Sequence, residues 1–428
     1  SGIEEVRMNH VIVGAGPAGI VAAESLRRLQ SDAGIVIIGD EHEPPYSRMA
    51  LPYLLSNQIR ESGTYLRKEV KHFSNQAIEV IQDTVAGIDR EQQQLTLSAG
   101  SSVAYDKLLI ATGSTPVSPP IPGIDLPGIY SCWTLDDGRN IAQRAKPGAR
   151  VLLMGAGFIG CIILEALARS GATLTVVEME DRMVPRMMND IAGGMIKSWC
   201  EQQGVSVHTS TQVTGIEKVG NEFTVSLSTG DSVAADLIVS ATGVRPNIDL
   251  LEGTGVETDH GILINRNMQT NDPSIFAAGD VAQGRDFSTG EYSVQAIQPT
   301  ATEHGQLAAR NMIGLSGAVH RGSVNMNVLD TIGLISSSFG LWMGKDGGES
   351  GELLNRDRYR YLNLQFDDDI LVGATSLGLT DHVGVLRGLI QTKTRLGAWK
   401  DRLIENPTRI MEAYLGSTHA VGFNAAIL

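Results

Sequence analysis

The sequence has few cysteines, few aromatic residues and no excess of positive charge. Its 428 residues include three cysteines, Cys132, Cys161 and Cys200, and no two of them form a C-x-x-C pair. We therefore expect neither a disulfide framework nor a cysteine-based metal site, and we expect a reducing, cytoplasmic compartment. The formal net charge of −14 argues against nucleic acid or an anionic membrane surface as a partner.

The sequence also lacks an apolar run long enough to span a membrane. The nearest candidate, VLLMGAGFIGCIIL at 151–164, ends before Glu165 and is interrupted by three glycines. We interpret it as a buried strand, a turn and a helix. Glycine is abundant, with 48 residues, which indicates many tight turns. The length predicts about two or three domains.

The first chemical motif is HVIVGAGPAGIVAAESLRRL at 10–29, an apolar strand followed by Gly-x-Gly-x-x-Gly and a helical pattern. In this context the glycines allow a tight turn, close approach of a pyrophosphate and close helix packing. The next strand ends in Asp40 and Glu41, and we expect Asp40 to accept hydrogen bonds from a ribose. A glycine-rich turn without a ligand is the alternative. The motif residues are Gly14, Gly16, Pro17, Ala18 and Gly19.

A second motif of the same kind occupies 149–182, and Glu178 ends the strand that follows it. Two such units predict two dinucleotides. A glutamate at this place would bind both ribose hydroxyls and repel a 2′-phosphate, so NAD(H) is favoured, although Arg182 nearby weakens that preference. A repeat with one inactive site is the alternative. The motif residues are Gly155, Gly157, Phe158, Ile159 and Gly160.

Two matching segments, YDKLLIATGSTP at 105–116 and ADLIVSATGVRPN at 235–247, each end a buried strand in Ala-Thr-Gly. The prolines after them indicate that the chain crosses between two sheets at these points. The second nucleotide unit is therefore predicted to be inserted into the first domain. The Ala-Thr-Gly residues are Ala111, Thr112 and Gly113 in the first segment and Ala241, Thr242 and Gly243 in the second.

Two further elements follow downstream. Gly279 and Asp280 end an apolar run, so Asp280 could bind a ribityl hydroxyl, or it could be an ordinary turn residue. The stretch 298–314 predicts a helix that begins at Pro299, next to Thr300, and ends at Gly314. The N-terminus of this helix should face anionic charge, unless the helix is a plain surface helix.

In this order the motifs VGAGPAG, LLIATGSTP, GAGFIG, ATGVRPN and FAAGDVA resemble the FAD- and NAD(P)-dependent pyridine nucleotide-disulfide oxidoreductase superfamily. The chain is most similar to the NADH-binding flavoprotein region of nitrite reductase, to rubredoxin reductase and to the ferredoxin reductases, over about residues 8–415. The resemblance implies an α/β fold like that of glutathione reductase, with two Rossmann-like domains and a C-terminal α+β interface domain. It implies FAD at the first motif, with Asp280 on its ribityl chain, and NADH at the second.

The resemblance also implies domain limits. The FAD-binding domain would be discontinuous, over 8–118 and 246–328. The NAD-binding domain, over 119–245, would be inserted into it, and the interface domain would cover 329–428.

The segment PPYSRMALPYLL at 44–55 decides how electrons leave the flavin. Relatives that act on disulfides or peroxide carry a cysteine where this chain has Met49, and a thioether cannot form a thiolate or a mixed disulfide. We therefore expect no catalytic residue other than the flavin itself. Cys161 is expected to be a packed small residue. Arg48 matches an arginine of the ferredoxin reductases and would neutralise FAD charge, or it forms an ordinary salt bridge.

Two departures from the family concern the nicotinamide and the partner. The second motif continues as Gly160-Cys161-Ile162, without the acid that relatives often have there, and 293–298 lacks a tryptophan that some ferredoxin reductases carry. His382 is expected to be a capping or surface histidine rather than a proton donor, and His304 is expected to be the same.

The sequence thus predicts an NADH-oxidising FAD enzyme in which NADH delivers hydride to the flavin, and the flavin passes electrons to an iron-sulfur or similar redox protein. In a second version the chain is the flavin subunit of a larger iron-sulfur complex that serves nitrite, an aldehyde or another substrate. An NADH oxidase and a redox-sensing flavoprotein like apoptosis-inducing factor are the alternatives. A homodimer or a hetero-complex is possible in each case.

Overall fold

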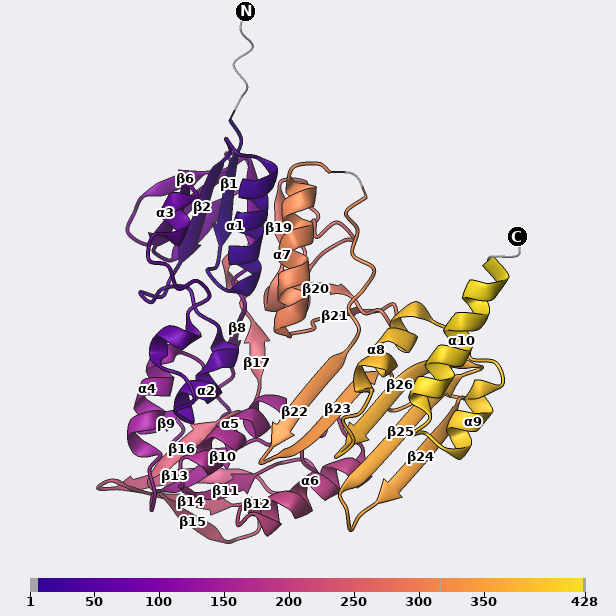
Figure 1. Ribbon diagram of the computed structural model, residues 1–428. Coiled ribbons are helices and arrows are strands. Elements are labelled where there is room, and N and C mark those ends of the chain that lie inside the picture. The colour runs from indigo at the N-terminus through magenta and orange to yellow at the C-terminus, as the bar shows by residue number, and fades with distance from the viewer. Residues whose placement is uncertain (1–6, 316, 426–428) are drawn as a thin grey trace, which may run out of the picture. The chain divides into compact units, whose positions relative to one another are not determined.

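The structure is a computed structural model that describes residues 7–315 and 317–425, with side chains up to residue 418 (Figure 1). Its internal contacts divide the chain into two units. Of the described residues, the first unit contains 7–54, 59–115, 244–315 and 317–323, and the second contains 55–58, 116–243 and 324–425. The three-domain division that the sequence suggests stays a prediction.

The first unit is built on a parallel sheet with the strand order β19-β7-β1-β2-β3. Its strands are short runs of branched apolar residues, such as VIV and IVII, which are buried on both faces because helices cover them. Helices α1 (Pro17–Leu29) and α7 (Gln298–Met312) pack side by side (Figure 1). The strands are β1 (Asn9–Val13), β2 (Gly34–Gly39), β3 (Ile78–Gln82), β7 (Lys107–Ile110) and β19 (Ile275–Ala277).

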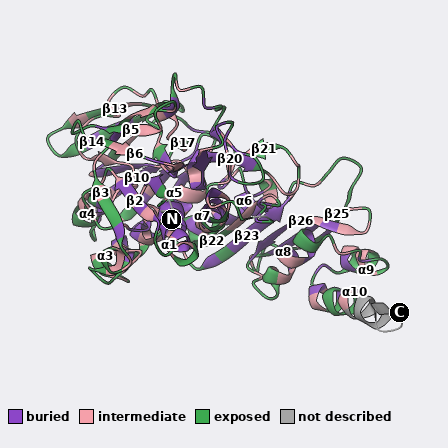
Figure 2. Ribbon diagram, turned by 90° about the horizontal axis from the view of Figure 1, so that it is seen from above, coloured by how far each residue is buried: buried purple, intermediate pink, exposed green. Residues whose placement is uncertain are grey.

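The second unit repeats this design with the order β12-β11-β10-β16-β9. The predicted strand, turn and helix at 151–164 are confirmed as β10 followed by α5 (Phe158–Arg169), and β10 is buried (Figure 2). The strands are β9 (Ile129–Tyr130), β10 (Arg150–Met154), β11 (Thr173–Val177), β12 (Ser206–His208) and β16 (Leu237–Ser240), and the other helices are α4 (Leu135–Arg144) and α6 (Asp190–Gln202).

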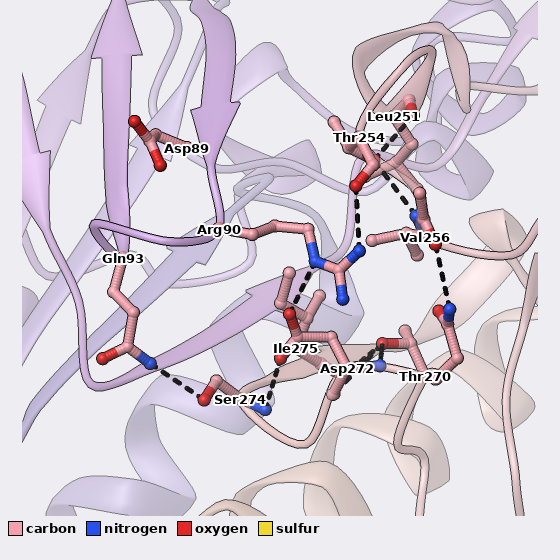
Figure 3. A network of polar contacts seen from close by, with 12 residues as sticks. Asp89, Arg90, Gln93, Leu251, Thr254, Val256, Thr270, Asp272, Ser274 and Ile275 are labelled. Atoms are coloured by element: carbon pink, nitrogen blue, oxygen red, sulfur yellow. Dashed lines mark hydrogen bonds and ion pairs between the residues drawn. The ribbon is translucent and has the colours of Figure 1, made fainter.

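Each unit also carries a small antiparallel sheet. In the first unit, Arg90 fixes the turn between β4 and β5, because its Nε lies 2.7 Å from Asp272 Oδ2 and its Nη1 lies 2.9 Å from the Thr254 carbonyl (Figure 3). Gln93 adds a bond of 2.9 Å to Ser274. The strands are β4 (Val85–Asp89), β5 (Gln94–Leu97) and β6 (Ser102–Ala104) in the first unit, and β13 (Val213–Val219), β14 (Glu222–Leu227) and β15 (Ser232–Ala235) in the second.

The C-terminal part of the second unit is an antiparallel sheet, β22-β23-β26-β25-β24, with three helices. The chain turns at Asp368 and Asp369 between β25 and β26, and α8 begins shortly after β26 ends. One face of the sheet packs against α6, where Asn189 Nδ2 donates to the Tyr361 hydroxyl over 2.8 Å. The elements are β22 (Met326–Thr331), β23 (Leu334–Gly340), β24 (Glu349–Asn355), β25 (Arg360–Asp367), β26 (Ile370–Leu377), α8 (Val383–Thr392), α9 (Trp399–Glu405) and α10 (Ile410–Ala425).

The remaining elements are short connections. They are η1 (Arg48–Ala50), α2 (Leu51–Leu55), η2 (Glu61–Thr64), α3 (His72–Asn75), β8 (Ser114–Pro116), β17 (Val244–Pro246), η3 (Asp249–Leu251), β18 (Ile262–Leu263), η4 (Gly279–Val281), β20 (Ala282–Arg285) and β21 (Tyr292–Ser293). Within the described ranges, the helices are too short or too polar to cross a lipid bilayer. The predicted fold class, two Rossmann-like sheets and a C-terminal α+β region, is confirmed.

Candidate functional site

The first candidate site lies where three neighbouring strands of the first unit end. Because β19, β7 and β1 are parallel and adjacent, the residues that follow them meet at one edge of the sheet. Gly14 follows β1 directly, Ala111 follows β7, and η4 with Gly279 and Asp280 follows β19. Binding sites of open parallel sheets form at this edge.

The glycines of the first motif have different physical roles. Gly14 has a φ of +116°, and a Cβ there would lie 2.0 Å from the carbonyl oxygen of Ala111. A Cβ on Gly19 would lie 2.0 Å from the carbonyl oxygen of Gly14, so this residue lets α1 approach the strand. A Cβ on Gly16 would meet nothing within 4 Å. There is therefore open space in front of the N-terminus of α1, which begins at Pro17.

Asp280 presents a carboxylate to the same edge. Its Oδ2 accepts a hydrogen bond of 3.0 Å from the hydroxyl of Ser114, the first residue of β8. Burial raises the pKa of Asp280, while the hydrogen bond from Ser114 and the charge of Arg48 act in the opposite direction. Thr300 is buried in the first turn of α7. A carboxylate can accept more hydrogen bonds than the one that Ser114 donates, so Asp280 can accept a further donor from a ligand.

The predicted start of α7 is close to the observed one. The helix begins at Gln298, with Pro299 in its first turn, and ends at Met312. The hydroxyl of Ser47 donates to Gln298 Oε1 over 2.7 Å, which fixes the segment around Arg48 to this helix end. Neither Ser47 nor Ser114 was expected from the sequence, since a serine carries no motif signal of its own.

Arg48 forms a salt bridge, and its predicted contact with FAD stays a prediction. Its guanidinium contacts the carboxylate of Glu41 and donates to the hydroxyl of Tyr46 over 2.7 Å, and that hydroxyl contacts Glu41 in turn. Glu41 is thus half-buried and paired, whereas Asp40 is exposed. The choice of Asp40 as the ribose ligand stays a prediction.

The sulfur-containing residues differ in burial. Met49 lies in η1 and is 44% exposed, so it is not a core residue. All three cysteines are buried and unpaired with one another, and the expectation that Cys161 is packed is confirmed, since its exposed fraction is 0%. Burial raises the pKa of Cys132 and of Cys200 to about 12, and raises that of Cys161 well above its usual range. None of these thiols is a nucleophile near neutral pH.

The second candidate site has the same backbone geometry at the ends of β10 and β16. Gly155 has a φ of +94°, and a Cβ there would lie 2.4 Å from the Ala241 carbonyl oxygen. A Cβ on Gly160 would lie 2.2 Å from the Gly155 carbonyl oxygen. At Gly157 a Cβ would again meet nothing within 4 Å, at the N-terminus of α5 where Phe158 begins the helix.

The acidic residue of this site, Glu178, is held in place by backbone amides. Glu178 is 7% exposed; its Oε2 accepts from the Ala156 amide over 2.6 Å and its Oε1 accepts from the Glu180 amide over 2.8 Å. Arg182, in contrast, donates to the carbonyl oxygens of Met188 and Pro185. It also forms a salt bridge of 2.8 Å with Asp181, so its donors already have partners in the backbone and in a carboxylate. In the Ala241–Gly243 turn, Thr242 Oγ1 donates to the Val117 carbonyl.

The prediction for one of the two histidines is wrong. His382 is exposed and stands at the start of α8 without a side-chain capping bond, as expected of a surface histidine. His304 is not at the surface; it is 4% exposed, on the buried side of α7. The error has a simple cause, because Glu303 before it and Gln306 two residues after it are polar and indicate an exposed position.

Two glycine-rich turns, each at the carboxyl edge of a parallel sheet, define a protein built to bind two dinucleotides. A family model described as pyridine nucleotide-disulphide oxidoreductase matches residues 8–305, and the chain belongs to this family. The predicted family is confirmed, and with it the predicted class, an oxidoreductase that uses FAD and a nicotinamide dinucleotide.

Relatives of known function match over much of the chain. The NADH-dependent phenylglyoxylate dehydrogenase subunit epsilon of Aromatoleum evansii is 31% identical over 411 residues, which cover 96% of this chain and 97% of the relative. The 3-phenylpropionate/cinnamic acid dioxygenase ferredoxin–NAD(+) reductase component of Photorhabdus laumondii is 33% identical over 310 residues. These residues cover 72% of this chain and 78% of the relative.

Solved structures agree on the fold. A ferredoxin reductase from Rhodopseudomonas palustris is 29% identical, with a TM-score of 0.79 over 86% of this chain and 91% of that chain. Putidaredoxin reductase, in a covalent complex with putidaredoxin, has a TM-score of 0.88 at 23% identity and covers 96% of this chain and 99% of that chain.

Proposed function

We propose that this chain is an FAD-dependent NADH:acceptor oxidoreductase that passes electrons to an iron-sulfur protein or subunit without a redox cysteine. The observation that carries this proposal is the combination of two open glycine turns with buried, unreactive thiols and an exposed methionine at residue 49. The named reductases among the relatives, of ferredoxin and of rubredoxin, support the choice of acceptor. We further propose a cytoplasmic location and the domain limits given above.

We place FAD in the first unit. The space at Gly16 suits a diphosphate, because backbone amides and the helix dipole of α1 point toward it. Asp280 suits a ribityl hydroxyl, since its carboxylate is buried and can accept more hydrogen bonds than the one from Ser114. The residues assigned to FAD are Gly14, Gly16, Pro17, Ala18, Gly19, Asp40, Glu41, Arg48, Ala111, Thr112, Gly113, Gly279, Asp280, Pro299 and Thr300.

We place NADH in the second unit. Glu178 uses each oxygen once for a backbone amide, and a carboxylate has about four lone-pair sites in total, so it can still accept from ribose hydroxyls. Arg182 is held by two carbonyl oxygens and by the carboxylate of Asp181, so it is not arranged to receive a 2′-phosphate. The residues assigned to NAD are Gly155, Gly157, Phe158, Ile159, Gly160, Glu178, Ala241, Thr242 and Gly243.

When bound, FAD would accept two electrons from NADH and release them to the acceptor. The chain contributes position and charge. The N-terminus of α7 favours negative charge on the group it faces, and Ser47 holds that helix end in place through Gln298. Met49 supplies no thiol that could take up electrons, so the residues around it can bind and orient but cannot relay.

A second version of the proposal makes the chain a flavin subunit of a larger complex. It is favoured by the near-complete, reciprocal match to a protein named as one subunit of an NADH-dependent dehydrogenase. The dioxygenase ferredoxin reductase component and a rubredoxin reductase each match 72% of the chain, so the match to the dehydrogenase subunit extends over more of the C-terminal region.

Electron acceptors test the proposal directly. Under anaerobic conditions NADH should bleach the flavin, and addition of a ferredoxin or rubredoxin should restore its colour at least about ten times faster than dissolved oxygen does. Absorbance in stopped-flow measurements gives both rates. Peroxide production that equals NADH consumption, with no gain from either carrier, would instead establish an NADH oxidase.

Replacing Glu178 with glutamine should weaken NADH specificity. The amide group would place a donor against the Ala156 or Glu180 amide and would no longer repel a 2′-phosphate. We expect the KM for NADH to rise about tenfold, which is about 1.4 kcal/mol, while the KM for NADPH rises less or falls. Glu180→Gln, two residues further on, is the control and should change neither the KM for NADH nor the KM for NADPH. An unchanged NADH to NADPH ratio in Glu178→Gln would contradict the assignment.

A further inference from the structure

A buried histidine stands behind the turn that carries Asp280. His304 lies on α7, and its Nδ1 is 3.3 Å from the backbone nitrogen of Gly279, whose N–H it accepts. Since Nδ1 accepts, the proton of a neutral ring must be on Nε2. Gly279 is the residue directly before Asp280, so the ring contacts the backbone that places this carboxylate.

The amide of Gly279 needs His304 as its acceptor, because the turn around Gly279 is tightly enclosed. Gly279 has a φ of +80°, and a Cβ there would lie 3.1 Å from Ala18 Cβ and 3.7 Å from Ala301 Cβ. The chain is therefore closely enclosed between α1 and α7, where water has little room. A buried amide without an acceptor is unfavourable, so the ring of His304 stabilises this particular backbone conformation.

The side chain of Asp280 is then fixed from two sides. Ser114 donates to its Oδ2 over 3.0 Å, and the His304 contact fixes the backbone one residue earlier. We propose that His304 is a positioning residue for flavin binding, which acts by holding the Gly279–Asp280 turn so that the carboxylate faces the ribityl chain. This inference rests on the proposed function, because it assumes that Asp280 binds FAD.

The surroundings of His304 keep it an acceptor. His320 lies edge-on to it, with ring centroids 4.9 Å apart and an interplanar angle of 89°, and is itself bonded to Ser323. Burial first, and the charge of His320 second, lower the pKa of His304 to about 3. The ring therefore stays neutral at physiological pH and does not turn Nδ1 into a donor that would face the Gly279 amide.

The test uses a double-mutant cycle with FAD affinity as the readout. We expect His304→Leu to weaken FAD binding by about thirtyfold, measured by flavin fluorescence on reconstitution of the apoprotein. His304→Asn, whose amide oxygen can replace Nδ1, should stay within about threefold of the unchanged chain. In the Asp280→Ala background, adding His304→Leu should weaken binding by less than about twofold, because the group it positions is gone. His260→Leu, an exposed histidine of the same unit, is the control.

The outcomes separate the inference from the proposed function. Equal losses from His304→Leu with and without Asp280 would overturn the positioning role, as would equal losses from the leucine and asparagine variants. If the leucine variant does not fold, His304→Gln, with its amide one bond further out, replaces it; loss with Gln but not with Asn supports the role, and no difference overturns it. Unchanged chain that binds no FAD would overturn the proposed function itself.

Discussion

Replacing Gly16 with glutamate should yield a folded but colourless protein. The position tolerates a side chain as far as the protein is concerned, because a Cβ there meets no atom within 4 Å and its φ of −81° is ordinary. The new carboxylate would occupy the space at the N-terminus of α1 and repel a diphosphate there. We expect flavin affinity to fall at least about 100-fold, roughly 2.7 kcal/mol, so that purified protein carries less than about a tenth of a flavin per chain.

The matched control is Gly87→Glu, in the small sheet of the same unit, where a Cβ also meets nothing within 4 Å. This variant should remain yellow. Circular dichroism of both variants shows whether they are folded, and absorbance after denaturation gives their flavin content. A yellow Gly16→Glu variant with full occupancy would show that the flavin is bound elsewhere.

Replacing Gly157 with glutamate should give a different phenotype, a yellow protein that NADH cannot reduce. Gly157 has the same open space in front of α5 that Gly16 has in front of α1. A carboxylate there should repel the diphosphate of NADH and leave the first unit unaffected. We expect the rate of flavin bleaching by limiting NADH to fall at least about 100-fold, while dithionite still bleaches it fully.

Gly194→Glu is the control for this variant, because it lies in α6 of the same unit and also has open space around its Cβ position. It should keep normal reduction by NADH. If Gly157→Glu were reduced by NADH at an unchanged rate, the second turn would be an inactive repeat, which is the alternative that the sequence left open.

Both predictions depend on the two glycine turns, and these turns could be predicted from the sequence. A glycine that must adopt a positive φ or pass within contact of another strand leaves a spacing pattern, and the apolar strands before Gly14 and Gly155 give that pattern its structural context. The order of strands in both parallel sheets follows from the same repeated units. The backbone of both candidate sites was therefore predictable.

The side chains that complete the sites were not predictable, because their roles arise from contacts between distant segments. Ser114 and Asp280 are 166 residues apart, and Ser47 and Gln298 are 251 apart. A serine or glutamine has no spacing signal across such intervals. His304 was misjudged because polar neighbours surround it in the sequence, whereas the fold turns its own side of α7 inward. The contact of Arg48 with Glu41 is of the same kind, because it also depends on how the segment around Arg48 folds.

Met49 bears on how many electrons the protein can hold. In a protein of this family a thiol at this place would store an electron pair, and here neither Met49 nor the buried cysteines can do so. The proposed enzyme therefore has a single redox centre of its own, and its capacity for electrons should be that of one flavin.

Anaerobic titration with dithionite counts this capacity directly. The visible flavin absorbance should bleach completely after about two electrons per flavin, with no further uptake and no long-wavelength band from a thiolate beside the flavin. Uptake of about four electrons per flavin, with such a band appearing midway, would show a redox-active disulfide and would contradict the account.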